Sequence, residues 1–437
     1  MRRLAFVLFL LVFTAGASAA ARVREIAWND IAPALQSLLT SQRMTRETLP
    51  TYVAGLRARN QARMREGDLD HLVYYMLQSS SFTRAPVIEP AASAAALVAG
   101  GAVPEAVNAR ISAFASAMDN ARRSVRLGYF RDLVARERAD AASFHVFLSA
   151  QYVRAMRFLY EKEFAEKGRA TPASSTLYQD RGLSTDTSVD AGYVVYLALA
   201  TLRQLEPDRR IQRVLVIGPG LDLAPRTGLV ETHAPQSYQP FAVMDALIGT
   251  GLADRASLRL SAIDINPRVV HWLDGARRTA PELAMYAGIR ETEQVHLTDD
   301  YRSYFAALGK SIGLTRPMRG LGARRLAKMV KVSSDVTAAV DAAAVDITVE
   351  GVDDRYDLIV VTNVFPYLSD TELLLALSNV VQMLKPGGVL LHNEPRPLLA
   401  NAMLALGLPL IHSRSAVVAT VDGGRSLYDA VWMHKAP

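Results

Sequence analysis

The stretch Arg213-Val214-Leu215-Val216-Ile217-Gly218-Pro219-Gly220-Leu221-Asp222 decides the fold that we expect for this chain. Its first half is a short apolar run of the kind found in parallel strands that are buried on both faces. Two glycines follow at once, and glycine allows the backbone to turn sharply and to approach a ligand closely. The stretch therefore predicts a buried strand that ends beneath a bound molecule.

Three later segments extend this strand into a sheet. Residues 258–263 form a second apolar run that ends in Asp264, and Pro267 suits the first turn of a helix. In a doubly wound sheet, an acid at the tip of the second strand accepts hydrogen bonds from the ribose hydroxyls of a nucleotide. A further buried strand over 356–363, a helix over 370–384 and a strand from Val389 follow. This alternation predicts an α/β fold with a doubly wound, mostly parallel sheet.

The same residues resemble the class I S-adenosylmethionine-dependent methyltransferases, over about residues 202–433. The glycine turn, residues 218–220 with the strand before it, looks like the first motif of this family. Residues 384–391 are similar to the helix-to-strand turn of the family. The resemblance implies a Rossmann-like sheet, closed by an antiparallel C-terminal hairpin over 416–420 and 426–432, and S-adenosylmethionine as the cofactor. The cofactor-binding positions that it implies are Gly218, Pro219, Gly220, Asp222, Asp264, Ile265, Asp346, Thr362 and Asn363.

The first motif departs from the family pattern at two positions. The family commonly has an acid where Val216 stands and a third glycine where Asp222 stands. Asp222 either takes over the amino group of the cofactor or caps the following turn, and the sequence leaves both open.

Two segments compete for the place of the third strand, after which the family has its adenine-binding acid. Residues 295–297 lead into Asp299 and Asp300, whereas residues 345–349 contain Asp346 and stand directly before the next strand. Family order favours 345–349. Residues 302–343 would then be a basic insertion, which we expect to be either a lid or anion-binding rim beside the cofactor, or a solvated helix face.

Catalytic candidates come from the carboxyl ends of strands, where ligands of open α/β sheets bind. Asn363 and Tyr367 follow the strand at 356–363, and His392 follows the next one. Methyl transfer needs a positioned nucleophile and, for hydroxyls or amines, removal of a proton, which is the role expected for His392 as a base. The alternative for His392 is a packed, hydrogen-bonded core residue. The loop matches the pattern of amino-methyltransferases only in part, so base methylation is not inferred.

The N-terminal part differs in character. Residues 1–19 combine two arginines, an apolar run and small residues, and they predict a secretory signal peptide, with an N-terminal membrane anchor as the alternative. Apolar residues at helical spacing then predict an α-helical domain over 20–175. We expect the methyltransferase-like domain over 176–437.

The composition excludes several classes of binding site. The 437 residues include no cysteine and only eight histidines, which leaves no thiolate site and little for a metal site. The net charge of +6 is no nucleic-acid signature by itself. After removal of the signal peptide, no stretch is long and apolar enough to span a membrane. The expected function is methyl transfer to an unidentified small molecule or envelope component by an exported protein, and the alternative is a non-catalytic ligand- or protein-binding derivative. The oligomeric state stays open.

Overall fold

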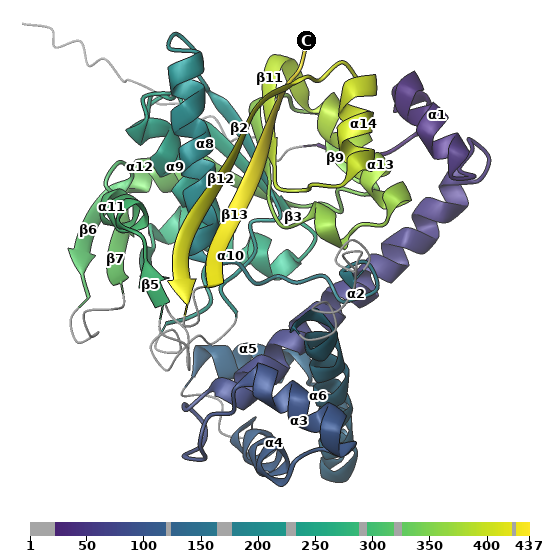
Figure 1. The fold of residues 1–437 in the computed structure, drawn as a ribbon, viewed down its shortest axis with the longest axis vertical. Helices are drawn as coiled ribbons and strands as arrows, with labels where there is room; N and C mark the ends of the chain where they lie inside the picture. The colour runs from purple at the N-terminus through teal and green to yellow at the C-terminus, as the bar shows by residue number, and fades with distance from the viewer. Residues whose placement is uncertain are drawn as a thin grey trace, which may run out of the picture.

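The computed structural model describes residues 22–118, 124–163, 177–223, 233–287, 295–318, 326–421 and 425–437. The predicted signal peptide lies outside these residues. Within them, no helix is long and apolar enough to cross a membrane. Figure 1 shows a large sheet wrapped by helices, with a separate group of helices below it.

The central element is an eight-stranded sheet of order β5-β12-β13-β11-β10-β2-β3-β8. The five strands from β11 to β8 run parallel, and β13, β12 and β5 are antiparallel to their neighbours. The strands are β2 (Arg213–Ile217), β3 (Arg259–Asp264), β5 (Val295–Leu297), β8 (Val340–Ala344), β10 (Tyr356–Val361), β11 (Leu384–His392), β12 (Leu410–Val421) and β13 (Arg425–Lys435). The predicted doubly wound, mostly parallel sheet with an antiparallel C-terminal hairpin is confirmed, and both hairpin strands are longer than expected.

Both faces of the sheet are buried, which explains the uninterrupted apolar runs of its parallel strands. Along β2, Val214 and Val216 belong to one core and Leu215 and Ile217 to the other. Helices α8 (Gly192–Leu205), α9 (Gln239–Gly249) and α10 (Pro267–Thr279) cover the first face. Helices α1 (Pro33–Ser41), α13 (Asp370–Gln382) and α14 (Pro397–Ala405) cover the second. In α13, Ser369 and Glu372 form a capping box.

The N-terminal helices divide between two cores. Strand β1 (Val23–Glu25) pairs with β9 (Glu350–Val352), and α1 packs on α13 and α14, so this end of the chain belongs to the sheet. Helix α2 (Leu49–Gln78) is 30 residues long and spans roughly 45 Å. Its first half packs in the core of the second face, and its last three turns pack in a core of helices. That core is completed by α3 (Pro90–Gly100), α4 (Glu105–Ala117), α5 (Val125–Leu133) and α6 (Ala141–Glu163).

An excursion between α10 and β8 carries the basic segment. It contains α11 (Asp299–Ala307), α12 (Ser334–Ala338) and a small antiparallel sheet of order β4-β7-β6. The strands are β4 (Glu282–Ala287), β6 (Gly313–Pro317) and β7 (Leu326–Val332). The solvated helix face considered for 302–343 is therefore wrong for its middle, which forms strands.

The third parallel strand is β8, not residues 345–349 as expected. Residues 347–349 form a turn, because the Asp346 side chain accepts hydrogen bonds from the Thr348 amide at 3.0 Å and from the Thr348 hydroxyl at 2.6 Å. Residues 295–297, the other candidate, form the far edge strand β5.

Candidate functional site

The glycine turn after β2 approaches two other segments closely. Gly218 and Gly220 have positive φ angles of 68° and 65°. A Cβ atom on Gly218 would lie 2.4 Å from Cγ2 of Val364, and one on Gly220 would lie 2.4 Å from the carbonyl oxygen of Thr185. Both the conformation and the lack of space therefore require glycine.

Asp264 stands at the tip of β3, beside this turn. Its Oδ2 accepts the amide of Gly220 at 3.2 Å, and its Oδ1 accepts the amide of Asn266 at 2.8 Å. The side chain is buried, and burial raises the pKa of the carboxyl to about 6, against the two amide hydrogen bonds, which lower it. The carboxylate is thus ionised at pH 7 and holds the glycine turn against the end of β3.

Asp346 follows β8, the strand next to β3. Its Oδ2 accepts a hydrogen bond from Nδ2 of Asn60 at 3.0 Å, and Asn60 also donates to the hydroxyl of Thr348 at 3.1 Å. Asn60 is on α2 and is 1% exposed. The long helix therefore contributes a buried amide to the edge of the sheet where the two acids stand.

These groups surround one cavity at the carboxyl ends of β2, β3, β8 and β10. It is lined by Asn60, residues 183–187, Ile217, Gly218, Gly220, residues 263–265, 345–348 and 362–364, Tyr367 and Leu368. Of the cofactor positions expected from sequence, Gly218, Gly220, Asp264, Ile265, Asp346, Thr362 and Asn363 line this cavity, and Pro219 and Asp222 do not.

Asp222 is held on the far side of the turn. Its carboxylate accepts hydrogen bonds from the amide of Gln236 at 2.6 Å and from the hydroxyl of Tyr238 at 3.2 Å. Arg126, from α5, lies 3.3 Å from Oδ1 and also donates to the Asp222 carbonyl oxygen. Burial raises the pKa of Asp222 to about 6, and Arg126 opposes this. Asp222 therefore joins the turn to the helical part of the chain.

Two of the three catalytic candidates line the cavity, and the third lies elsewhere. Asn363, with φ of 59°, and Tyr367 both line the cavity, and Asn363 exchanges hydrogen bonds with Asn393. Burial raises the pKa of the Tyr367 phenol, so that it stays protonated at neutral pH. His392 does not line this cavity. It is 2% exposed and lines a second cavity beneath α14.

A strap of residues 183–187 lies against the glycine turn and forms a second wall of the cavity, which the sequence analysis did not predict. The strap precedes α8, which begins only at Gly192. The amide of Leu221 donates to the carbonyl of Thr185 at 2.8 Å, and the amide of Thr187 donates to that of Leu221 at 3.0 Å. On its other side the strap crosses α2, where the amide of Leu183 donates to the carbonyl of Arg63 at 2.8 Å.

Asp68 of α2 joins the strap to the sheet. It is fully buried, and its carboxylate accepts hydrogen bonds from the hydroxyl of Thr185 at 3.1 Å, from the hydroxyl of Tyr129 at 3.2 Å and from Arg268 at 2.8 Å. The amide group of Asn266, two residues after Asp264, donates to the same Thr185 hydroxyl at 3.0 Å. The sequence signal that could have indicated this junction is an acid, Asp68, beside the apolar residues Leu69 and Leu72 of one helix.

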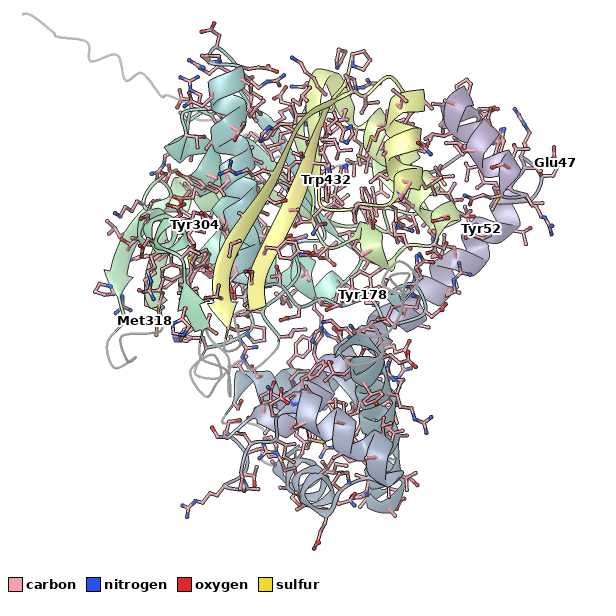
Figure 2. All side chains as sticks on the ribbon, in the orientation of Figure 1. Glu47, Tyr52, Tyr178, Tyr304, Met318 and Trp432 are labelled. Carbon is pink, nitrogen blue, oxygen red and sulfur yellow. The ribbon has the colours of Figure 1, made fainter. Side chains whose placement is uncertain are left out.

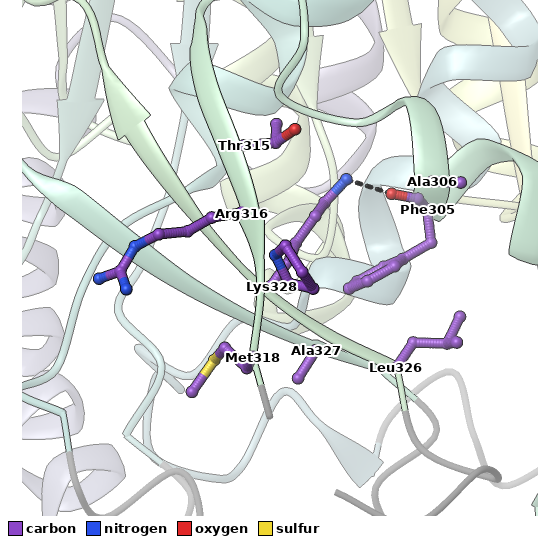
Figure 3. A pocket seen from close by; sticks show the side chains of 9 residues that line it. Phe305, Ala306, Thr315, Arg316, Met318, Leu326, Ala327 and Lys328 are labelled. Atoms are coloured by element: carbon purple, nitrogen blue, oxygen red, sulfur yellow. Dashed lines mark hydrogen bonds between the residues drawn. The ribbon is translucent and has the colours of Figure 1, made fainter. Parts of the chain in front are cut away.

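A third cavity, of about 330 Å³, lies in the excursion between β6, β7 and α11 (Figure 3). The ammonium group of Lys328 is turned inward and donates to the carbonyl oxygens of Phe305 and Leu308. The Arg316 side chain points away from Lys328 and forms an ion pair with Glu282 at 2.8 Å. Two basic groups of the segment thus already have partners; Arg319, Arg324 and Arg325 lie outside the described residues.

Comparison with known proteins relates part of this sheet to methyltransferases. Residues 324–403, from the start of β7 to α14, match the family model described as Nodulation protein S (NodS). The sequence matches no curated protein.

Solved structures, two of them of methyltransferases, are similar to larger parts of the chain. The N-methyltransferase NodS from Bradyrhizobium japonicum WM9, in complex with S-adenosyl-L-homocysteine, is 17% identical over 64% of this chain and 98% of its own, with a TM-score of 0.30. Magnesium protoporphyrin IX methyltransferase from Synechocystis PCC 6803, with bound S-adenosylmethionine, is 11% identical over 62% of this chain and 100% of its own, with a TM-score of 0.30. TrmN from Thermus thermophilus is 13% identical over 66% and 68%, with a TM-score of 0.26.

At these TM-scores the superpositions carry no weight, and the fold rests on the strand order and the family match. The resemblance expected for the C-terminal half is confirmed by the match over 324–403. The chain thus contains a doubly wound sheet similar to that of S-adenosylmethionine-dependent methyltransferases, with helices α2 to α6 placed beside its carboxyl edge.

Proposed function

We propose that the protein binds S-adenosylmethionine in the cavity between the glycine turn and the strap, and transfers its methyl group to a small molecule or an envelope component. The observation that carries this proposal is the buried carboxylate of Asp264, which lines the cavity and is fixed by the amides of Gly220 and Asn266.

The residues present fit a nucleoside. An ionised carboxylate offers about four lone-pair sites, and the two amides occupy one on each oxygen. Asp264 therefore keeps one acceptor site on each oxygen, which matches two neighbouring ribose hydroxyls. Gly218 and Gly220 line the cavity and, as glycines, place no side chain of their own in it. Asp346, steadied by Asn60, would accept from the amino group of adenine.

Bound S-adenosylmethionine would supply a methyl group on a positively charged sulfur, which a nucleophile displaces in line. The protein then has to orient the acceptor and exclude water. Thr362, Asn363 and Tyr367 line the cavity and are the residues that we assign to this task. The raised pKa of Tyr367 makes it a hydrogen-bond donor to the acceptor rather than a base.

One observation favours a second candidate function, a binding protein without transferase activity. The acid common in the first motif is replaced by Val216, and Asp222 is engaged by Arg126 and Gln236. The methionine part of the cofactor would therefore find fewer charged partners than the nucleoside part. Such a protein would bind nucleosides and would not transfer a methyl group.

Calorimetric titration of residues 20–437 with S-adenosylmethionine and S-adenosylhomocysteine tests the proposal. We expect binding in the micromolar range, and a loss of about a hundredfold or more in Asp264→Ala, since a buried hydrogen-bonded charge contributes about 3 kcal/mol. Asp208→Ala, which changes an exposed acid in the turn before β2, should leave affinity unchanged. If neither ligand bound, the assignment of S-adenosylmethionine as the cofactor would be refuted. Equal affinity for adenosine would favour the second candidate.

We further propose that residues 1–19 direct export of the chain. A charged cofactor made in the cytosol should not cross a membrane unaided, so an exported enzyme needs a supply or must leave the cytosol already loaded. Mass measurement of the protein recovered from the periplasm and the medium tests this proposal. A product that begins at residue 20 would support it, and an intact N-terminus in the membrane fraction would favour the anchor.

A further inference from the structure

We propose that the cavity beneath α14, separate from the cofactor cavity, binds a neutral small molecule through an oxygen that both accepts and donates a hydrogen bond, as in a phenol or an alcohol. This site stands apart from the proposed methyl transfer and does not rest on it. The inference comes from two stacked histidines whose ring nitrogens have different roles.

The cavity measures about 300 Å³ and has an aromatic wall. His392 ends β11 and pairs with Trp432 of β13, and His434 follows two residues later on the same face. The His392 ring is stacked on Trp432, with 6.0 Å between centroids, and on His434, with 5.2 Å. Trp432 is labelled on its strand in Figure 2. Met403 of α14 lines the same cavity.

The backbone fixes the tautomer of His392. The amide of Glu394 donates to its Nδ1 at 3.2 Å, so Nδ1 carries a lone pair. Burial lowers the pKa of the ring to about 3, with the nearby His434 as the smaller cause, and the ring is neutral at pH 7. A neutral imidazole with a lone pair on Nδ1 carries its proton on Nε2. This buried donor has no hydrogen-bond partner among the residues that the structure describes.

His434 has the opposite tautomer. Its Nδ1 lies 3.0 Å from the carbonyl oxygen of Leu408, which can only accept, so Nδ1 is protonated and Nε2 carries the lone pair. Two adjacent rings that line the cavity therefore carry one N–H donor and one nitrogen acceptor. A hydroxyl group complements both, because it accepts and donates at one atom. Leaving a buried donor unpaired is costly, which favours a ligand that satisfies it.

The other charged groups of the cavity neutralise each other. Arg396 lies 3.2 Å from Glu394 and donates to the carbonyl oxygens of Leu368 and Phe365. The mouth is apolar, since Leu404 is 77% and Leu410 is 51% exposed. A neutral ring or alkyl group fits such a rim. A cavity of about 150 Å³ already takes up benzene, so this one has room for a substituted ring.

Phenol and toluene are matched probes, because they share a ring and differ in the hydroxyl. We would titrate both into residues 20–437 with Trp28 and Trp272 changed to phenylalanine, and follow the fluorescence of Trp432. We expect phenol to bind about tenfold more tightly than toluene, as expected for one buried hydrogen bond. His392→Phe should abolish this preference. Met403→Trp should block both probes by filling the cavity, and calorimetry measures this variant because it adds a second tryptophan. Equal affinity for the two probes, or a phenol preference that survives in His392→Phe, would overturn the proposal.

Nitrogen-15 spectra of the histidine rings provide a readout that does not depend on variants. We expect the proton of His392 on Nε2 and that of His434 on Nδ1, and we expect phenol to shift both Nε2 signals. A His392 proton on Nδ1, or Nε2 signals that phenol does not move, would contradict the site.

Discussion

The two walls of the cofactor cavity are built in different ways. The glycine turn is one contiguous stretch, fixed by the strand before it and by the amide hydrogen bond to Asp264. The second wall joins α2, the strap of residues 183–187 and the start of α10, which are far apart in the sequence. Their meeting point is Asp68, which is fully buried and bonded to Thr185 and Arg268. One wall is a local structure, and the other exists only in the folded chain.

This difference predicts how each wall fails. At the first wall, a change of Asp264 should impair binding with little loss of fold, because the backbone ladder of the sheet remains. Changes at the junction of α2 and the strap should weaken the fold first and binding second. The buried polar groups there depend on one another, so removing one leaves the others without partners.

The largest effect is expected for Asp68→Ala. It leaves Arg268 and the hydroxyl of Thr185 without their acceptor. Because the Arg268 side chain is 38% exposed, we expect a loss of about 3 kcal/mol, at the lower end for a buried ion pair. Urea unfolding measures this free energy. Asp68→Asn keeps one oxygen acceptor and should cost less. Losses below about 1 kcal/mol in both variants would show that the junction does not hold the second wall.

A smaller effect is expected where the strap crosses α2. A Cβ atom on Gly67 would lie 1.9 Å from the carbonyl oxygen of Leu183, so Gly67→Ala must displace the strap. We expect a loss of about 1–3 kcal/mol in thermal or urea unfolding, together with weaker cofactor binding. Gly55→Ala is the matched control. Gly55 lies on the same helix, and a Cβ atom there would have no neighbouring atom within 4 Å. That variant should be neutral or more stable by about 0.5–1 kcal/mol. Similar results for the two variants would mean that the strap does not need this close approach.

The sequence predicted the first wall and missed the second for physical reasons. Gly218, Gly220 and Asp264 lie at the ends of apolar strands, so local pattern and position in the sheet were enough. Strand β8 was placed five residues too late because its sequence, Val340-Asp341-Ala342-Ala343-Ala344, has low strand propensity, and it is a strand through its pairing with β3. Asn60 and the strap reach the cavity only through tertiary contacts.

The smallest effect concerns pH and separates two buried acids of the same turn. Asp264 lines the cavity and Asp222 does not, although burial raises the pKa of each to about 6. Ribose hydroxyls donate to an ionised carboxylate, so affinity for S-adenosylmethionine should fall as the pH drops through 6. For a pKa of about 6, the ionised fraction of the carboxyl decreases about tenfold between pH 7 and pH 5, and affinity should decrease by about the same factor.

Folding depends on pH in the opposite direction, which keeps the two effects apart. A carboxyl with a pKa near 3.8 when unfolded and about 6 when folded favours the folded state at low pH, and this contribution is lost as the pH rises from about 4 through 6. Weaker binding at pH 5 can then not be attributed to loss of fold at this group. Asp222→Asn should keep the pH dependence of binding and flatten part of that of unfolding, whereas Asp264→Asn should bind weakly at every pH. If Asp222→Asn abolished the pH dependence of binding instead, the carboxylate that binds the ligand would be Asp222, on the side of the turn that faces Arg126. The ligand would then have been assigned to the wrong carboxylate.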